Sequence, residues 1–154
     1  MIIYLLCLEQ KKYYVGRTND IVRRYQEHLE EEGCQWTKVY KPYKYKILVE
    51  QGDMFDEDKY VFITMMKKGI DNVRGGSYCQ FHLSPKTKQI LYNHIANATD
   101  RCFKCGKIGH YANECPNKEI NVYQNPNIAK KSLVVRKCGK CGVGGHNVRT
   151  CTKT

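Results

Sequence analysis

The sequence predicts an α+β domain over roughly its first two thirds, followed by two small cysteine-rich units. Three observations support this. Up to about residue 100, short β-branched and aromatic runs alternate with stretches of helical periodicity. Beyond that point the apolar periodicity ends, and cysteine, glycine and lysine dominate. A pattern of three cysteines and one histidine then occurs twice, which indicates two units of the same kind.

The strands of the first domain are predicted from their composition. Ile2–Cys7 is rich in β-branched and aromatic residues, and Lys12–Val15 is a second short run of this kind. Only Leu8 to Lys11 lie between them, which favours a β-hairpin. Tyr45–Glu50 is the third predicted strand, and the segment from Trp36 to Tyr43 ahead of it is expected to be a loop.

Three helices are predicted from apolar spacing and capping residues. The first covers residues 21–30 and follows three N-cap candidates, Thr18, Asn19 and Asp20. The second, residues 55–68, is apolar around most of its circumference and is therefore expected to be buried against the sheet. Residues 72–76 are expected to form a loop. The third helix covers residues 84–96, with serine as its cap and proline in its first turn.

The charge is divided unevenly along the chain. Residues 1–100 hold 15 basic and 13 acidic side chains, a net charge of +2, whereas residues 101–154 hold 11 and 2, a net charge of +9. A basic tail suits a polyanionic partner, although charge alone does not separate nucleic acid from a membrane surface. The predicted divisions are a domain, a connecting helix, a first unit, a polar linker and a second unit, at residues 1–80, 81–100, 101–116, 117–137 and 138–152.

The repeated pattern has the spacing C-x2-C-x4-H-x4-C, and its two copies are displaced by 36 residues. In both copies, glycines after the second cysteine and before the histidine allow the tight turn that gathers four ligands. Three thiolates and an imidazole form a closed tetrahedral set, which is typical of structural zinc. Two zinc ions are therefore predicted. The ligands are Cys102, Cys105, His110 and Cys115 for the first, and Cys138, Cys141, His146 and Cys151 for the second.

The first of these units resembles the CCHC zinc knuckles of retroviral nucleocapsids. In that family two aromatic residues stack on unpaired bases, and the matching positions here are Phe103 and Tyr111. Lys104 and Lys107 are expected to contact the nucleic acid as well. The resemblance therefore implies binding to single-stranded nucleic acid.

The second unit resembles the same family but lacks the aromatic residues. Gly139 and Asn147 stand at those positions, so this unit is expected to hold phosphate through Lys140 and Arg149 or to dock a protein partner. Each loaded site adds a charge of about −1, which leaves the tail near +7. It is still clearly basic.

Zinc thiolates favour a reducing, intracellular compartment over a secreted disulfide scaffold. The apolar start, Ile2 to Leu8, has no basic segment before it and is too short to span a bilayer, so it is interpreted as a strand. Neither a secretory signal nor a membrane partner is expected.

Several polar residues of the first domain suit phosphodiester hydrolysis. Arg24 and His28 lie four residues apart on one helix face, and Glu57 stands between Asp56 and Asp58 at the start of another helix. A carboxylate for a metal, a cation for the developing negative charge and a phenol or imidazole base would suffice. From spacing alone, solvated helix ends and surface pairs explain the same residues.

The stretch IIYLLCLEQKKYYVGRTNDIVRRYQEHL resembles the GIY-YIG endonuclease domain. The two name motifs of that family appear as Ile2-Ile3-Tyr4 and Tyr14-Val15-Gly16. Trp36 to Pro42 resembles the family's loop ahead of the third strand, and Gly69 to Tyr78 resembles a branch found in large DNA viruses. The resemblance implies a three-stranded antiparallel sheet flanked by helices. Its departures, Ile2 for glycine and Val15 for isoleucine, fall on backbone or packing positions.

The resemblance also implies a set of site residues. The family's catalytic positions fall on Tyr4, Tyr14, Arg24, His28, Glu57 and Asn72.

The same resemblance assigns roles to them. Glu57 would hold one Mg²⁺ or Mn²⁺, and Arg24 would offset the growing charge on the phosphate. Tyr4, preferred over Tyr14, would be the general base, with His28 orienting it or relaying its proton. Two further arginines are candidates: Arg17 is expected to hold a flanking phosphate, and Arg74 either to bind phosphate or to pack the loop.

The sequence therefore predicts a metal-dependent endonuclease that cuts DNA, with knuckles that bind the nucleic acid. The alternative is a non-catalytic zinc-knuckle protein that binds RNA or single-stranded DNA and carries an inactive nuclease-like domain. Six chemically competent catalytic positions favour the nuclease. RNA stays open as a substrate, and so does the choice among duplex, branched and single-stranded DNA.

The duplicated pattern predicts two zinc ions per chain. Elemental analysis of protein purified without chelators should find two, and one or none would contradict the prediction. Removing zinc should unfold the tail and leave residues 1–100 folded, because such small units have no core of their own.

Overall fold

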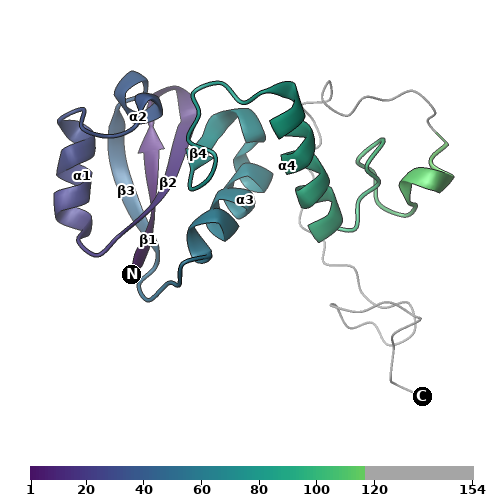
Figure 1. Ribbon diagram of the computed structural model, residues 1–154, viewed down its shortest axis with the longest axis horizontal. Coiled ribbons are helices and arrows are strands. Elements are labelled where there is room, and N and C mark those ends of the chain that lie inside the picture. Colours follow the sequence, from purple (N-terminus) through teal and green to yellow (C-terminus); the bar gives the residue numbers. More distant parts are fainter. Residues whose placement is uncertain (117–154) are drawn as a thin grey trace, which may run out of the picture.

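The computed structural model describes residues 1–116. Within them, α1 and α2 lie on one side of a β-sheet, and α3 and α4 lie on the other (Figure 1). The elements in chain order are β1 (Ile2–Leu8), η1 (Glu9–Lys11), β2 (Lys12–Thr18), α1 (Ile21–Leu29), α2 (Gln35–Val39), β3 (Pro42–Val49), α3 (Asp56–Lys68), η2 (Ile70–Asn72), β4 (Val73–Gly75), α4 (Pro85–Ala98) and η3 (Ala112–Glu114). In this part of the chain, no helix has the length and apolar character needed to cross a bilayer.

The sheet has four strands in the order β3-β1-β2-β4. β1 pairs antiparallel with β2 and β3, whereas β4 pairs parallel with β2. The expected three-stranded antiparallel sheet was therefore wrong: the sheet is mixed and contains a fourth strand where a loop was predicted. β4 has only three residues and ends in glycine, so its sequence shows no recognisable strand pattern. It forms a strand because this segment lies beside β2 and pairs with it.

The segment expected to be a loop, from Trp36 to Tyr43, is also structured. It contains most of α2, and β3 begins at Pro42, three residues before the predicted start. A helix of one turn is too short to show helical periodicity, which explains why it was missed. Proline is compatible with the first position of an edge strand. β3 is such an edge, and its exposed Lys44 and Lys46 are typical of edges protected against further pairing.

Side chains of β1 alternate between two cores. Ile3 belongs to the core beneath α3 and α4, whereas Tyr4, Leu6 and Leu8 belong to the core beneath α1 and α2. A strand points successive side chains to opposite faces, so a strand covered on both faces has to be apolar along its whole length. This accounts for the unbroken apolar run at the start of the sequence.

Helix α3 lies between the sheet and α4 (Figure 1). Val61 and Met65 enter the core under the sheet, and Phe62 contacts His94 of α4 with ring centroids 5.6 Å apart. Two packed faces explain why this helix is apolar around most of its circumference, as the sequence predicted.

Arg74 of β4 is buried, with 3% of its surface exposed. Its guanidinium lies 4.3 Å from the centroid of the Trp36 ring. It donates to four backbone carbonyls, those of Ile70, Val73, Gln80 and Phe81, at 2.7–3.1 Å. Of the two roles expected for Arg74, this geometry favours packing over phosphate binding.

Replacing this guanidinium should destabilise the domain strongly. Arg74→Met leaves several buried carbonyls without donors, so we expect a loss of roughly 3–5 kcal/mol of unfolding free energy, measured by chemical denaturation. Lys59→Met is the matched control, because Lys59 is exposed and its ion pair with Asp56 at the surface should contribute little to stability. A loss below about 1 kcal/mol in Arg74→Met would contradict a structural role.

Candidate functional site

The paired strands β1 and β2 bring two tyrosines together. Tyr4 stands opposite Gly16 in the antiparallel register, and its ring centroid is 6.5 Å from that of Tyr14. A Cβ at Gly16 would lie 2.5 Å from the Tyr4 hydroxyl oxygen, so any side chain there would displace the phenol. The glycine of the second motif therefore makes room for the tyrosine of the first.

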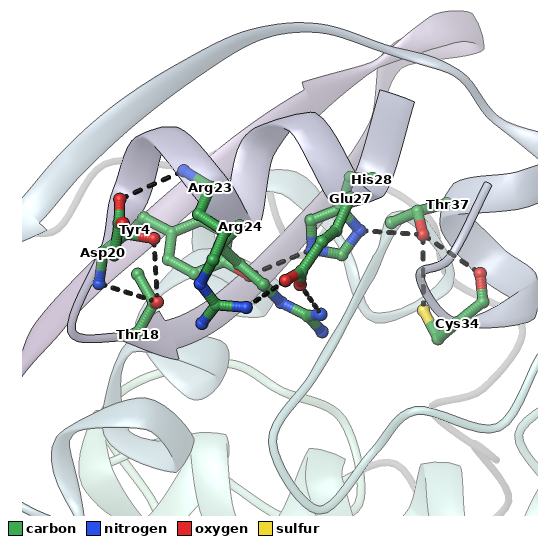
Figure 2. Close-up of polar contacts among 9 residues, drawn as sticks. All are labelled: Tyr4, Thr18, Asp20, Arg23, Arg24, Glu27, His28, Cys34 and Thr37. Atoms are coloured by element: carbon green, nitrogen blue, oxygen red, sulfur yellow. Dashed lines mark hydrogen bonds and ion pairs between the residues drawn. The ribbon is translucent and has the colours of Figure 1, made fainter. Parts of the chain in front are cut away.

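Helix α1 places a cation, Arg24, and an imidazole, His28, beside the phenol of Tyr4 (Figure 2). Asp20 caps the helix by accepting from the backbone N–H groups of Val22 and Arg23 at 3.1 and 3.0 Å. One turn further, Arg24 donates to Glu27 at 2.7 Å, and its charge lies near enough to Tyr4 to lower the pKa of that phenol. Glu27 therefore holds the arginine near the tyrosine.

His28 lies at the centre of a buried hydrogen-bond chain (Figure 2). Its Nε2 is 3.0 Å from the Tyr4 hydroxyl, and its Nδ1 is 3.1 Å from Oγ1 of Thr37. His28 and Tyr4 both have 0% of their surface exposed. The imidazole ring also lies 5.2 Å from the Tyr14 ring, between centroids. The phenol of Tyr4 is thus fixed between α1 and the sheet.

Burial keeps these groups neutral at ordinary pH. It raises the pKa of Tyr4 to about 12, against the lowering effect of Arg24, and it raises the pKa of Tyr14 further still. Burial and the neighbouring Arg24 charge lower the pKa of His28 to about 4. Arg24 differs from these groups because it remains a cation. Burial alone would lower its pKa, but the interactions with Glu27 and Tyr4 have the larger effect, and the pKa of Arg24 is raised.

Glu57 is the carboxylate of the acidic triplet that faces this cluster. One of its oxygens lies 3.2 Å from Arg17 Nε, and the other accepts from the Gly76 N–H at 3.3 Å. Burial raises the pKa of Glu57, while Arg17 and the Gly76 N–H oppose that rise. The side chain is mostly covered, with 16% exposed. A partly buried carboxylate beside an arginine is poised to exchange that cation for another.

The two flanking carboxylates have other partners. Asp56 pairs with Lys59 at 2.9 Å and accepts from the Asp53 N–H at 3.0 Å. Asp58 accepts from the backbone and hydroxyl of Ser77 at 2.8 and 2.6 Å. Both residues therefore stabilise the start of α3 and the loop after β4, and neither reaches the tyrosines.

Glu57 suits a small divalent cation only in part. Mg²⁺ typically takes one or two protein carboxylates and completes its shell with water and substrate phosphate. In the part of the chain that the structure describes, groups of three or more potential ligands occur only in the first knuckle. Glu57 thus fits as a single protein ligand to an ion shared with the substrate, provided that Arg17 releases it.

Asn72 is not brought to this cluster. Its side chain accepts from Lys12 Nζ at 2.8 Å and donates to the Lys68 carbonyl at 2.8 Å. It precedes β4 by one residue, whereas Gly76, which contacts Glu57, follows the strand. Four residues of extended chain span about 13 Å. The end of β4 at Asn72 therefore lies away from the end at Gly76, which contacts Glu57.

Two charged residues of the site differ from the sequence prediction. Arg17 was given another role, and Glu27 was not predicted at all. Arg17, expected to hold a flanking phosphate, pairs with Glu57 while 47% of its side chain is exposed. Glu27 also pairs with Arg23, and the i,i+3 and i,i+4 spacing of Glu27 from these arginines is a signal that could have identified it. Thr37 gave no such signal, because nine residues and a change of helix separate it from His28.

The first knuckle gathers its four ligands as the spacing predicted. The ligand atoms of Cys102, Cys105, His110 and Cys115 all lie within 4.8 Å of one another. A tetrahedral zinc with Zn–S bonds of about 2.3 Å needs sulfurs roughly 3.8 Å apart, so this arrangement fits. Gly106, after the second cysteine, and Gly109, before the histidine, have φ values of 67° and 111°. These positive values confirm that the tight turn between the two ligands needs glycine.

Both aromatic positions of this knuckle are open to solvent. Phe103 is 43% and Tyr111 67% exposed, and Lys104 and Lys107 are exposed as well. Large apolar rings left in water on a small metal-held unit are available to stack on a ligand. The second predicted unit lies outside the described residues. The residues predicted for it are therefore not described, namely the zinc ligands Cys138, Cys141, His146 and Cys151 and the nucleic-acid contacts Lys140 and Arg149.

Comparison with known proteins finds two family matches. Residues 1–64 match the family described as GIY-YIG catalytic domain, and residues 100–117 match the family described as zinc knuckle. The first part of the chain is thus similar to the GIY-YIG catalytic domain, and the Cys/His group of residues 102–115 lies within the match to the zinc knuckle.

Individual relatives match over shorter stretches. A UPF0213 protein of Xanthomonas campestris and one of Xanthomonas axonopodis are each 42% identical over 40 residues, which is 26% of this chain and 39% of theirs. A human endogenous retrovirus group K Gag polyprotein is 28% identical over 92 residues, 58% of this chain and 14% of that protein. The chain therefore spans well under half the length of these relatives. No solved structure matches.

The buried His28 should make the domain sensitive to acid. The pKa of His28 falls from its ordinary 6.5 to about 4 on folding. Between those pH values the unfolded chain binds the extra proton, so stability falls as pH falls. From about pH 7.5 to about pH 5, His28 should cost roughly 2 kcal/mol of unfolding free energy.

The measurement is denaturation followed by the fluorescence of Trp36, the single tryptophan, which reports on this domain. His28→Gln should lack this part of the pH dependence while keeping that of other groups. An equal loss of stability in the variant and the natural protein would show that His28 is not the buried neutral group described.

Proposed function

We propose that this protein is a metal-dependent endonuclease that hydrolyses phosphodiester bonds in DNA, and that its knuckle holds the nucleic acid. One observation carries the proposal. Arg24, Tyr4 and Glu57 come from α1, β1 and α3, and they interact electrostatically in one partly buried place. A fold has no structural need to gather a cation, a phenol and a carboxylate there, whereas phosphodiester cleavage needs all three.

In the proposed reaction, Arg24 binds the scissile phosphate and offsets the charge that grows on it. Glu27 keeps the guanidinium in place and leaves part of its donor fork free. Arg17, already half exposed, would hold a neighbouring phosphate once it leaves Glu57. A divalent cation, Mg²⁺ or Mn²⁺, would be held by Glu57 and would supply Lewis-acid activation of the phosphate and of water.

Tyr4 is the proposed general base, in preference to Tyr14. Its hydroxyl has a nearby cation, Arg24, which lowers its pKa, and a neutral imidazole 3.0 Å away. Tyr14 has a pKa raised further by burial and the nearby Cys79 and Tyr4, so it is the harder phenol to ionise. Because Tyr4 rests with a pKa of about 12, its proton has to leave while the water attacks, not before.

The substrate is proposed to contain unpaired bases near the cut. Phe103 and Tyr111 offer exposed rings for stacking, a form of contact available only to unpaired bases. A branched or frayed DNA would therefore suit both halves of the protein. RNA remains the alternative that a substrate panel would test.

Glu57→Gln should abolish Mg²⁺-dependent cleavage while leaving the fold and nucleic-acid binding nearly intact. Asp56→Asn and Asp58→Asn are matched controls, since these carboxylates serve Lys59 and Ser77 instead. Cleavage of labelled duplex, single-stranded and branched DNA, with and without Mg²⁺, is the measurement. Activity that survives in Glu57→Gln but is lost in either control would place the metal elsewhere. No cleavage of any substrate by the natural protein would support the non-catalytic alternative.

The knuckle should contribute to binding by two separable means. Phe103→Ala should weaken binding to single-stranded DNA by about 1–3 kcal/mol without changing its salt dependence, because stacking releases no counterions. Lys107→Ala, in the same knuckle, should instead lower the salt slope by about 0.7. Affinity measured across a salt series tests both. Neither change should alter single-turnover cleavage at saturating substrate, and unchanged affinity in both variants would make the knuckle a docking surface for protein.

A further inference from the structure

We propose that Thr37 is a positioning residue of this site, which fixes His28 in the tautomer whose Nε2 accepts the proton of Tyr4. The inference rests on the proposed function, in which Tyr4 is the general base. It adds a residue from a different helix, α2, and a defined direction for the proton (Figure 2).

The direction follows from the hydroxyl of Thr37. Its Oγ1 donates to the backbone carbonyl of Cys34 at 3.0 Å. A hydroxyl has a single proton, so towards His28 the same oxygen can act only as an acceptor. The contact of 3.1 Å between Thr37 Oγ1 and His28 Nδ1 is therefore a bond donated by Nδ1–H.

A neutral imidazole carries one proton, and Thr37 assigns it to Nδ1. Nε2 is then a bare acceptor, 3.0 Å from the Tyr4 hydroxyl, and Tyr4 O–H donates to it. The nearby Arg24 charge acts on the Tyr4 oxygen and lowers the pKa of that phenol. The whole chain runs one way, from Tyr4 through His28 and Thr37 to the Cys34 carbonyl.

The surroundings are built to hold this arrangement. Thr37 has 1% and His28 0% of its surface exposed, so water does not compete for either bond. A Cβ on Gly33 would lie 2.4 Å from both His28 Nδ1 and Thr37 Oγ1, so the loop between α1 and α2 needs glycine to pass this contact. The Cys34 carbonyl also accepts from the backbone N–H groups of Thr37 and Lys38, at 3.0 and 3.1 Å. Loss of the hydroxyl in a variant would therefore leave this carbonyl with two backbone donors.

This orientation matters for the proton path. As water attacks phosphorus, a P–O bond forms, and the water's proton passes to the Tyr4 oxygen while the Tyr4 proton passes to His28 Nε2. The bond to the leaving oxygen breaks, and that oxygen takes a proton from solvent. His28 becomes a cation whose Nδ1–H still donates to Thr37. The relay then runs in reverse: Nε2 returns its proton to Tyr4, and Tyr4 releases the proton that it took from the water. With the other tautomer, Nε2–H would face Tyr4 and no acceptor would be present.

The tautomer can be read directly by two-bond ¹H–¹⁵N NMR of the full, zinc-loaded chain, with the His28 signals identified by their loss in His28→Gln. In the natural protein, Nδ1 should be protonated and Nε2 bare. Thr37→Val keeps the shape but removes the acceptor, so the proton should move to Nε2. Cleavage should fall between about 10- and 1,000-fold in kcat with KM nearly unchanged. Thr37→Ser should restore both the tautomer and the rate to within about threefold.

Thr64→Val is the control for substitution of a buried threonine, since Thr64 is 7% exposed on α3 and takes no part in this chain. It should change neither spectrum nor rate. If Thr37→Val unfolds the domain, Gly33→Ala offers a second way to separate the same two atoms and should give the same shift.

The outcomes separate this inference from the proposed function. A natural protein with Nε2–H, or a tautomer that survives loss of the Thr37 hydroxyl, would overturn the role of Thr37 whether or not the protein cuts DNA. A tautomer that moves without any change in cleavage would overturn its role in the reaction. A protein that cuts nothing yet shows the predicted tautomers would overturn the nuclease, and Thr37 would then only maintain the geometry of the pocket.

Discussion

The hydrogen bond between Tyr4 and His28 joins the central strand of the sheet to the first helix, and the geometry of the site depends on it. It is fully buried, so it has no competition from water, and a neutral bond in such a place is both strong and strict in geometry. A glycine packs against each of its two partners. Gly16 leaves space for the phenol, and Gly33 leaves space for the contact behind the imidazole. Both glycines are thus required by close approach and not by backbone conformation.

This constraint explains how the two layers share the work. The layer beneath α3 and α4 is apolar and supplies packing, while the layer beneath α1 and α2 contains the phenols, the imidazole and the tryptophan. β1 serves both because its side chains alternate. The carboxylate, Glu57, comes from the apolar side but reaches the site from the first turn of α3, where the helix has not yet become buried. The site therefore lies at the edge of the sandwich, where a phosphate backbone can approach.

Charge is arranged in a corresponding way. The cations nearest the site, Arg17 and Arg24, are each paired with a carboxylate, so the resting site is close to neutral. Arg74, although basic, is committed to four carbonyls inside the fold and contributes little outside it. Long-range attraction of a polyanion then falls to the tail, whose basic excess the sequence shows directly. In the proposed function, cutting and holding are thus assigned to different parts of the chain.

The sequence by itself determined the features that depend on spacing. The ligand set of the first knuckle, Cys102 to Cys115, is fixed by four residues within one short turn, and no distant contact is needed to form it. The long strand β1 and the helices α1, α3 and α4 follow from local periodicity and caps. The grouping of Tyr4, Tyr14, Arg24, His28 and Glu57 was foreseen through family resemblance, because their motifs are local, although their mutual contacts are not.

Only the tertiary structure decided what depends on distant partners. β4 is three residues long and exists because β2 lies beside it. Thr37 acquires its role from a helix of one turn that returns to α1, and no periodicity could report this. The fate of the polar residues was likewise undecided by sequence: Arg74 and Asn72 are drawn into hydrogen bonds within the fold, whereas Glu57 alone among three adjacent acids turns to the site. A side chain's chemistry is readable from sequence, but its partner is selected by the packing of elements far apart in the chain.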